Sequence, residues 1–179
     1  MTPATAASQA RQPITFALMM LKSGHADAFV GGMREPYPET IRPAIQIIGL
    51  ADGAKRVSAL HLLVLRDKLY FCADTMVNIE PDVETLAEIG ELAARNFDIE
   101  PRIAFLAFST FGSVRHPISQ RVSNAVALLH ARRPDLVVDG EMHLEAAVDP
   151  ELVRDNYPHS RIKGDANILI FPDLTSGNI

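Results

Sequence analysis

Apolar residues recur at the spacing of an amphipathic helix in several parts of the chain, which predicts helices over about residues 7–22, 37–49, 82–99 and 117–131. Pro13 and Pro43 favour helix starts close to themselves, because proline is accepted in the first turn of a helix but not in its interior. Asp82 is a residue type that caps the start of the third of these helices. A fifth stretch, residues 145–155, is predicted to be helical in part.

Between the predicted helices lie short apolar runs with the length and composition of strands. The runs are residues 27–32, 56–65, 68–74, 102–108, 136–144 and 166–171. The second and third are separated only by the charged turn "RDK", which predicts an antiparallel hairpin. Strands that alternate with helices predict an α/β fold, with a mixed sheet flanked by helices. We expect residues 1–179 to form a single α/β domain.

The composition is that of a globular chain with a substantial core, since 47% of the 179 residues are apolar and 22% are charged. The net charge is −5, with scattered Lys and Arg and no Trp, so we expect no nucleic-acid partner. The apolar runs fall short of the length of about 20 residues needed to span a membrane, and the first residues lack the apolar core of a signal peptide. The single cysteine, Cys72, is interpreted as a small buried hydrophobe. Together, these features favour the reducing cytoplasm as the compartment of the protein.

The most suggestive candidate site is the stretch "RIAFLAFSTFGSVRHP", in which a strand leads through a loop into a helix. In open α/β sheets, ligands gather beyond the carboxyl ends of strands. The hydroxyls of Ser109, Thr110 and Ser113, the flexible Gly112 and free amides at the helix start would suit an anion such as phosphate. Arg115 or His116 could add charge. The alternative is that this loop only caps the helix.

Two other clusters are weaker candidates. Asp139, Glu141 and His143 alternate along a predicted strand and would share one face, where they could hold a metal ion or move protons. They could equally be the wet face of an edge strand, and without a second ligand cluster we expect no metal site. The polar residues of "ADTMVNIEP" favour a structural turn over a site.

Arg42 lies near the start of an otherwise apolar helix, "TIRPAIQII". A guanidinium in that place could bind an anion through two hydrogen bonds at once. By its sequence context alone, Arg42 could also be an ordinary surface residue.

Taken in order, several blocks of the sequence resemble the phosphate acetyl/butyryltransferase family. They are "GHADAFVGG", "IRPAIQIIG", "YFCADTMVNIEP", "RIAFLAFSTFGS", "PDLVVDGEMHLEAAV" and "GDANILIFPDLTSGN". The resemblance covers nearly the whole chain and rests on the order of the blocks. "STFGS", with Phe111 in place of the usual Lys, and "DGEMH" are most similar to the phosphotransacetylase-like domain at the C-terminal end of bacterial NADP-dependent malic enzymes.

The resemblance implies a fold similar to that of isocitrate dehydrogenase, with an acyl-CoA and phosphate site in a cleft between two domains. It also implies that the chain is a fragment of a longer region, because the family's later Ser-Arg-Gly motif and the Asp that follows it are not found here. Those residues supply a catalytic base in the family, so we expect the chain alone to lack phosphotransacetylase turnover.

Carried over by position, the resemblance implies a substrate-binding set. Its members are Arg42, Ser109, Gly112, Ser113, Asn167, Ser176, Gly177 and Asn178, with no catalytic residue assigned. Glu35, Pro36 and Tyr37 depart from the threonine-rich stretch that the family has before Arg42.

The implied ligands are CoA or acetyl-CoA, as substrate or effector, with phosphate or acyl phosphate, and no tightly bound cofactor. The implied function is acetyl transfer between CoA and phosphate. The alternatives are an acetyl-CoA-sensing and dimerisation domain of a malic enzyme, or a bare dimerisation module. In each case the family resemblance implies a homo-oligomer, most simply a homodimer.

Overall fold

A computed structural model describes residues 3–32, 34–95 and 99–179 of the chain, which forms two compact units, Met1–Lys55 and Arg56–Ile179. Each unit is described by itself. The fold of the second unit positions most of the candidate site.

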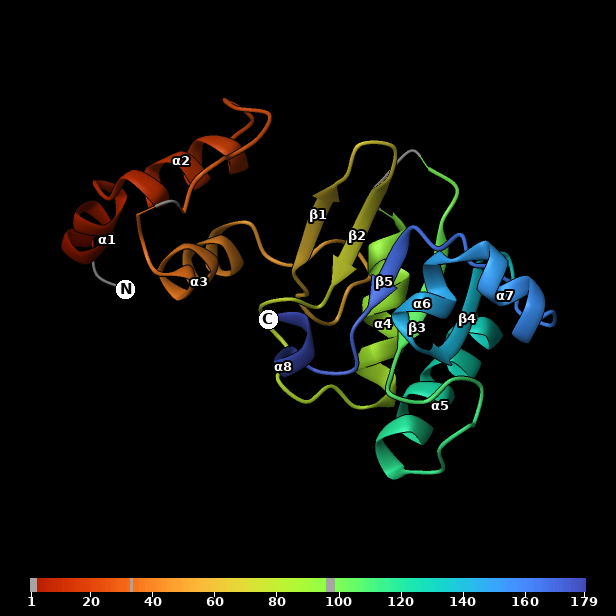
Figure 1. Cartoon of the computed structure of the whole chain (residues 1–179). Helices are drawn as coiled ribbons and strands as arrows, with labels where there is room; N and C mark the ends of the chain where they lie inside the picture. The colour runs from red at the N-terminus through yellow and green to blue at the C-terminus, as the bar shows by residue number, and fades with distance from the viewer. Residues whose placement is uncertain (1–2, 33, 96–98) are drawn as a thin grey trace. The chain divides into compact units, whose positions relative to one another are not determined.

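The N-terminal unit is helical, with α1 at Pro3–Ala10, α2 at Pro13–Lys22 and α3 at Tyr37–Ile47 (Figure 1). Pro13 begins α2, as predicted, and Pro43 lies inside α3 rather than at its start. The predicted strand at residues 27–32 is wrong, since this segment forms neither helix nor strand and Val30 is 95% exposed. No described strand of this unit is available to pair with the segment, and Gly32 has a φ of 96°, which is outside the range of a strand.

The second unit is built on a five-stranded sheet in the order β1-β2-β5-β3-β4. Its strands are β1 at Leu60–Val64, β2 at Leu69–Ala73, β3 at Arg102–Leu106, β4 at Val137–Met142 and β5 at Ile168–Ile170. The first two pair antiparallel as the predicted hairpin, while β2, β5, β3 and β4 run parallel to one another. The prediction of a mixed sheet is confirmed.

Helices cover both faces of this sheet (Figure 1). On one face, α4 at Val83–Arg95 and α5 at Pro117–Arg132 bury Leu86 and Leu129 against Phe105. On the other face, α6 at Leu144–Val148 and α7 at Pro150–Asn156 pack with the strand residue Met142. The predicted flanking helices are therefore confirmed. Residues 96–98, within the predicted extent of the helix at 82–99, lie outside the described residues.

Local chemistry explains where α4 begins. The Asp82 carboxylate accepts hydrogen bonds from the Thr85 amide at 2.8 Å and the Thr85 hydroxyl at 2.6 Å, as expected for a helix cap. These bonds lower the pKa of Asp82 below its ordinary value. In the sheet, Cys72 packs against the second apolar core, and burial raises the pKa of its thiol. Asp82 caps the helix as predicted, whereas Cys72 is half-buried rather than fully buried.

Candidate functional site

The carboxyl ends of the parallel strands meet at one edge of the sheet, which we call the carboxyl edge. The segments that leave the sheet here are residues 74–78 after β2, 107–114 after β3, 143 onward after β4 and 171–178 after β5. The last of these contains α8 at Leu174–Gly177. This is the edge at which open α/β sheets bind ligands.

The loop of residues 109–114 is tied to β4 by the carboxylate of Glu141. Oε1 of Glu141 accepts from the Ser109 hydroxyl at 2.8 Å and from the Gly112 amide at 2.7 Å. The Phe111 amide donates to the Glu141 carbonyl oxygen at 2.8 Å. Ser109 and Glu141 are almost fully buried, at 0% and 3% exposure. Glu141 therefore fixes this loop from inside the protein.

The backbone amides of residues 110–114 are all bonded within the protein. The amides of Thr110 and Val114 donate to the hydroxyl oxygens of Ser113 and Ser109, at 3.0 and 3.1 Å. The Ser113 amide donates to the Thr110 carbonyl oxygen, and those of Phe111 and Gly112 bond to Glu141. An anion at this loop would therefore depend on side chains rather than on a cradle of amides.

The first turn of α5 is capped by the protein itself. The Ile118 amide donates to Nδ1 of His116, and the His116 amide donates to the Ser119 hydroxyl. The helix-cap alternative considered for this stretch is thus correct for His116. Arg115 is exposed beside this cap and remains available to a ligand.

Asp139, Glu141 and His143 do not form the predicted row on one face. The pairing of β3 with β4 shifts register between Phe105 and Leu106, where Phe105 pairs with Gly140 and Leu106 with Met142. An inserted residue reverses the alternation of side chains. Asp139 bonds instead to the Ser160 hydroxyl and the Arg161 amide. His143 lies beyond the strand, as the N-cap residue of α6.

Asp74, directly after β2, is a buried structural carboxylate. Its oxygens accept from the amides of Ala59, Met76, Val77 and Asn78, at 3.1, 3.0, 3.1 and 2.8 Å, and from the Asn78 side chain. Its exposure is 3%. The predicted structural turn is confirmed at this position.

Ser176, Gly177 and Asn178 pack beside that turn. A Cβ at Gly177 would come within 2.4 Å of the Asp74 carbonyl oxygen, so only glycine allows this approach. The Asn178 side-chain amide donates to the Thr75 carbonyl oxygen at 2.7 Å. The Ser176 hydroxyl donates within the cap of α8, where Asp173 accepts at 2.9 Å. This segment therefore shares the carboxyl edge with the loop at residues 109–114.

Asn167 does not lie with these residues. It precedes β5, at the opposite end of that strand from Ser176. Its side chain accepts from the Arg102 amide at 2.8 Å and donates to the Glu100 carbonyl oxygen at 2.8 Å. Asn167 thus holds the start of β3 by two hydrogen bonds. The predicted substrate-binding set is corrected here, because Asn167 lies at the end of the sheet opposite the carboxyl edge.

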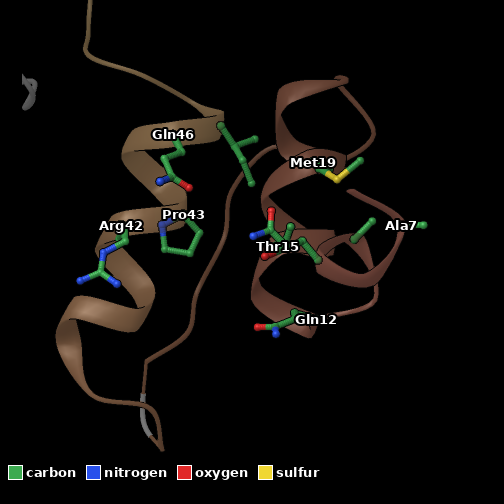
Figure 2. Close-up of a pocket in the computed structure, with 10 residues that line it drawn as sticks. Ala7, Gln12, Thr15, Met19, Arg42, Pro43 and Gln46 are labelled. Atoms are coloured by element: carbon green, nitrogen blue, oxygen red, sulfur yellow. The ribbon is translucent and has the colours of Figure 1, made fainter. Parts of the chain in front are cut away.

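Arg42 belongs to the N-terminal unit, where it lines a pocket of about 690 Å³. Figure 2 shows Arg42, Pro43 and Gln46 on α3 at one side of this pocket, with Gln12 and Thr15 at the other. Arg42 is exposed, and among the described residues its guanidinium has no hydrogen-bond or ion-pair partner. It is therefore available to an anionic ligand.

Sequence reasoning missed two contacts at the carboxyl edge. Glu141 was considered as a metal ligand, a proton carrier or part of a wet strand face, whereas it is buried and anchors the Ser109 loop. Arg121 of α5 donates to the Pro172 carbonyl oxygen at 3.0 Å and so links this helix to the segment after β5. The adjacency of β3 and β4 could have indicated the first contact, while nothing in the local pattern points to the second.

Within residues 3–32, 34–95 and 99–179, no group of three or more His, Cys, Asp or Glu residues could hold a metal ion. No described helix combines the length and the hydropathy that crossing a membrane requires.

The five-stranded sheet, with its parallel strands ending at the carboxyl edge, places the second unit in the open-sheet class of α/β folds. The family model described as "Phosphate acetyl/butaryl transferase" matches residues 1–179, so the chain belongs to this family. The predicted family resemblance is confirmed.

Comparisons with individual proteins support this family assignment. The chain is 41% identical over 167 residues to a phosphate acetyltransferase of Bacillus subtilis, covering 92% of the chain and 52% of the relative. It is 40% identical over 170 residues to an NADP-dependent malic enzyme of Escherichia coli, covering 93% of the chain and 22% of that protein. The crystal structure of a Streptococcus pyogenes phosphotransacetylase superposes with a TM-score of 0.86 at 38% identity, covering 99% of the chain and 55% of that structure. The chain thus spans about half the length of the phosphate acetyltransferases it matches.

Proposed function

We propose that this chain binds acyl-CoA and phosphate or acyl phosphate, and that it belongs to a protein that transfers acetyl groups between CoA and phosphate. The observation that carries the proposal is the match of the whole chain to one transferase family. The placement of the Ser113 loop and of residues 176–178 at one sheet edge supports a site there. We place the reaction in the cytoplasm.

In the proposed reaction the CoA thiolate attacks the acetyl carbonyl of acetyl phosphate, a new C–S bond forms, and the C–O bond to phosphate breaks. Inorganic phosphate leaves with the electron pair. The exposed Arg42 guanidinium would balance the phosphate charge, since Arg pairs well with phosphate oxygens. At the carboxyl edge of the second unit, Ser113 and the segment at 176–178 would contact the ligand, and Ser109 and Gly112 would position the loop.

The test uses acetyl-CoA and phosphate with the 179-residue chain. We expect acetyl-CoA to shift amide resonances of residues 109–114 and 174–178 in NMR spectra. In the intact protein, loss of the thioester absorbance after phosphate is added would reveal transfer. Binding elsewhere, or no binding at millimolar acetyl-CoA, would contradict the proposal.

A second candidate function is acetyl-CoA sensing in a malic enzyme. The match to the E. coli NADP-dependent malic enzyme favours it, together with Phe111. The Phe111 ring packs with its centroid 4.7 Å from that of His159 and 5.5 Å from that of Tyr157. Because phenylalanine is uncharged, this position offers no cation to a ligand. In the intact protein, acetyl-CoA that binds at the carboxyl edge and is not consumed when phosphate is present would favour sensing over transfer.

We also propose that the protein is a homodimer. In β1 and the turn after it, Leu62, Val64 and Leu65 are 51%, 68% and 52% exposed, at the free edge of the sheet. Exposed apolar edge strands tend to be covered by a partner. Light scattering should therefore give the dimer mass, and Val64→Lys should shift it towards the monomer. Val30→Lys, at a position 95% exposed in the N-terminal unit, is the matched control. A monomer mass at every concentration would contradict this proposal.

A further inference from the structure

Strand β4 carries two buried carboxylates with nearly identical surroundings. Glu141 accepts from the Ser109 hydroxyl at 2.8 Å and the Gly112 amide at 2.7 Å. Asp139 accepts from the Ser160 hydroxyl at 2.9 Å and the Arg161 amide at 2.7 Å. Only the first pair of donors belongs to the loop at the carboxyl edge. The protein thus contains a site-linked carboxylate and a matched internal control.

The protons of the loop hydroxyls can be assigned from these contacts. Ser109 accepts from the Val114 amide and gives its single proton to Glu141, so it has no proton left for a ligand. Ser113 accepts from the Thr110 amide, and its own proton has only the Ser109 oxygen within reach, at 3.4 Å. Hydroxyl hydrogen bonds are normally about 2.7–2.8 Å long, so this contact is weak.

Exposure separates the two serines in the same way. Ser109 is 0% exposed, whereas Ser113 lies on the exposed part of the loop. The amides around Ser113 are bonded within the protein, as shown above. The Thr110 hydroxyl accepts from the His143 amide and is only 5% exposed. The Ser113 hydroxyl is therefore the exposed hydroxyl donor that the stretch from Ser109 to Val114 can offer to a ligand.

We propose that Ser109 and Glu141 are positioning residues that hold the loop so that the Ser113 hydroxyl donates to a phosphoryl oxygen of the ligand. This assignment rests on the proposed function. It divides the serines of the predicted site into one that contacts the ligand and one that supports the loop. It also places a buried carboxylate beneath the site as the anchor of the loop.

The first test needs no ligand. In the full 179-residue chain, Ser109→Ala should accelerate hydrogen exchange of the Val114 amide by about tenfold, because this amide loses its acceptor. The Gly112 amide should also exchange faster, because its acceptor, Glu141, loses the hydroxyl that orients it. Glu141→Gln keeps one acceptor oxygen without the charge and should produce a smaller acceleration of the Gly112 amide. Ser160→Ala removes the equivalent bond to Asp139. It should therefore accelerate hydrogen exchange of the Arg161 amide and leave that of the Gly112 amide unchanged. Unaltered Gly112 exchange in Ser109→Ala would overturn the anchoring role.

The second test is titration with inorganic phosphate, followed by NMR. Ser113→Ala should weaken binding by about tenfold, as expected for a hydrogen bond to a charged group, and Ser113→Thr should restore it. Ser109→Ala should weaken binding as well, while Ser160→Ala, with a similar loss of a buried hydrogen bond, should not. If Ser109→Ala and Ser160→Ala lowered the affinity for phosphate equally, the effect would be a general structural one and the proposal would be overturned.

The two accounts can fail separately. The role of Ser113 would be overturned if Ser113→Ala left the affinity for phosphate unchanged. It would also be overturned if phosphate shifted no amide resonance of the loop. Acetyl-CoA binding at the carboxyl edge would still support the proposed function in that case. Conversely, the predicted changes in hydrogen exchange could be observed while acetyl-CoA does not bind. That result would support the anchoring role of Ser109 and Glu141, but it would contradict the proposed function and the ligand role given to Ser113.

Discussion

Replacing Asp74 by Ala should lower the free energy of unfolding of the sheet unit by about 4 kcal/mol, since hydrogen bonds to charged groups contribute about 1.5–3 kcal/mol each. The carboxylate holds the amides of residues 76–78 and that of Ala59, which leads into β1. At 3% exposure, water cannot fully replace it. Because domains are stable by about 5–15 kcal/mol, the variant should be close to unfolding. Urea denaturation followed by circular dichroism measures the effect.

The matched control is Asp149→Ala. Asp149 also accepts from two amides, those of Glu151 and Leu152, but it is an exposed helix cap. Its loss should cost about 1 kcal/mol. Asp74→Asn, which keeps an acceptor, should fall between the two. Equal costs for the Asp74 and Asp149 variants would contradict the structural role that we assign to Asp74.

Much of the fold could be predicted because its periodic signals are strong. The apolar face of α4 and the hairpin turn "RDK" each have a clear local cause, and both are confirmed. The segment at residues 27–32 was predicted as a strand from composition alone. A strand requires a neighbour to satisfy its backbone, and that requirement cannot be read from a short run.

The candidate site was less predictable, because its chemistry depends on contacts between distant segments. Glu141 and Gly112 are 29 residues apart, and their hydrogen bond removes an amide that the sequence offers to a ligand. The register shift opposite Phe105 could not be seen in an alternating pattern. Asn167 is different, since its position before a parallel strand already indicates the other end of the sheet.

The second large effect is expected at Arg42. We expect Arg42→Ala to weaken phosphate binding by at least about tenfold, because a guanidinium with no partner among the described residues offers two charge-assisted hydrogen bonds. Arg42→Lys keeps the charge but loses the planar fork, so its effect should be intermediate. Arg115→Ala should have less effect. Arg11, exposed in the same unit as Arg42, provides the matched control, and Arg11→Ala should bind as the unaltered chain does.

The central claim is that the loop at residues 109–114 and the segment at residues 174–178 bind one anionic ligand at the carboxyl edge, and a single NMR titration tests it. Phosphate is added to the labelled 179-residue chain and to its Ser113→Ala variant while the amides of both segments are followed together. The account predicts that both segments shift with the same dissociation constant and that both responses weaken in the variant. Shifts that persist unchanged in Ser113→Ala, or two different dissociation constants, would contradict it.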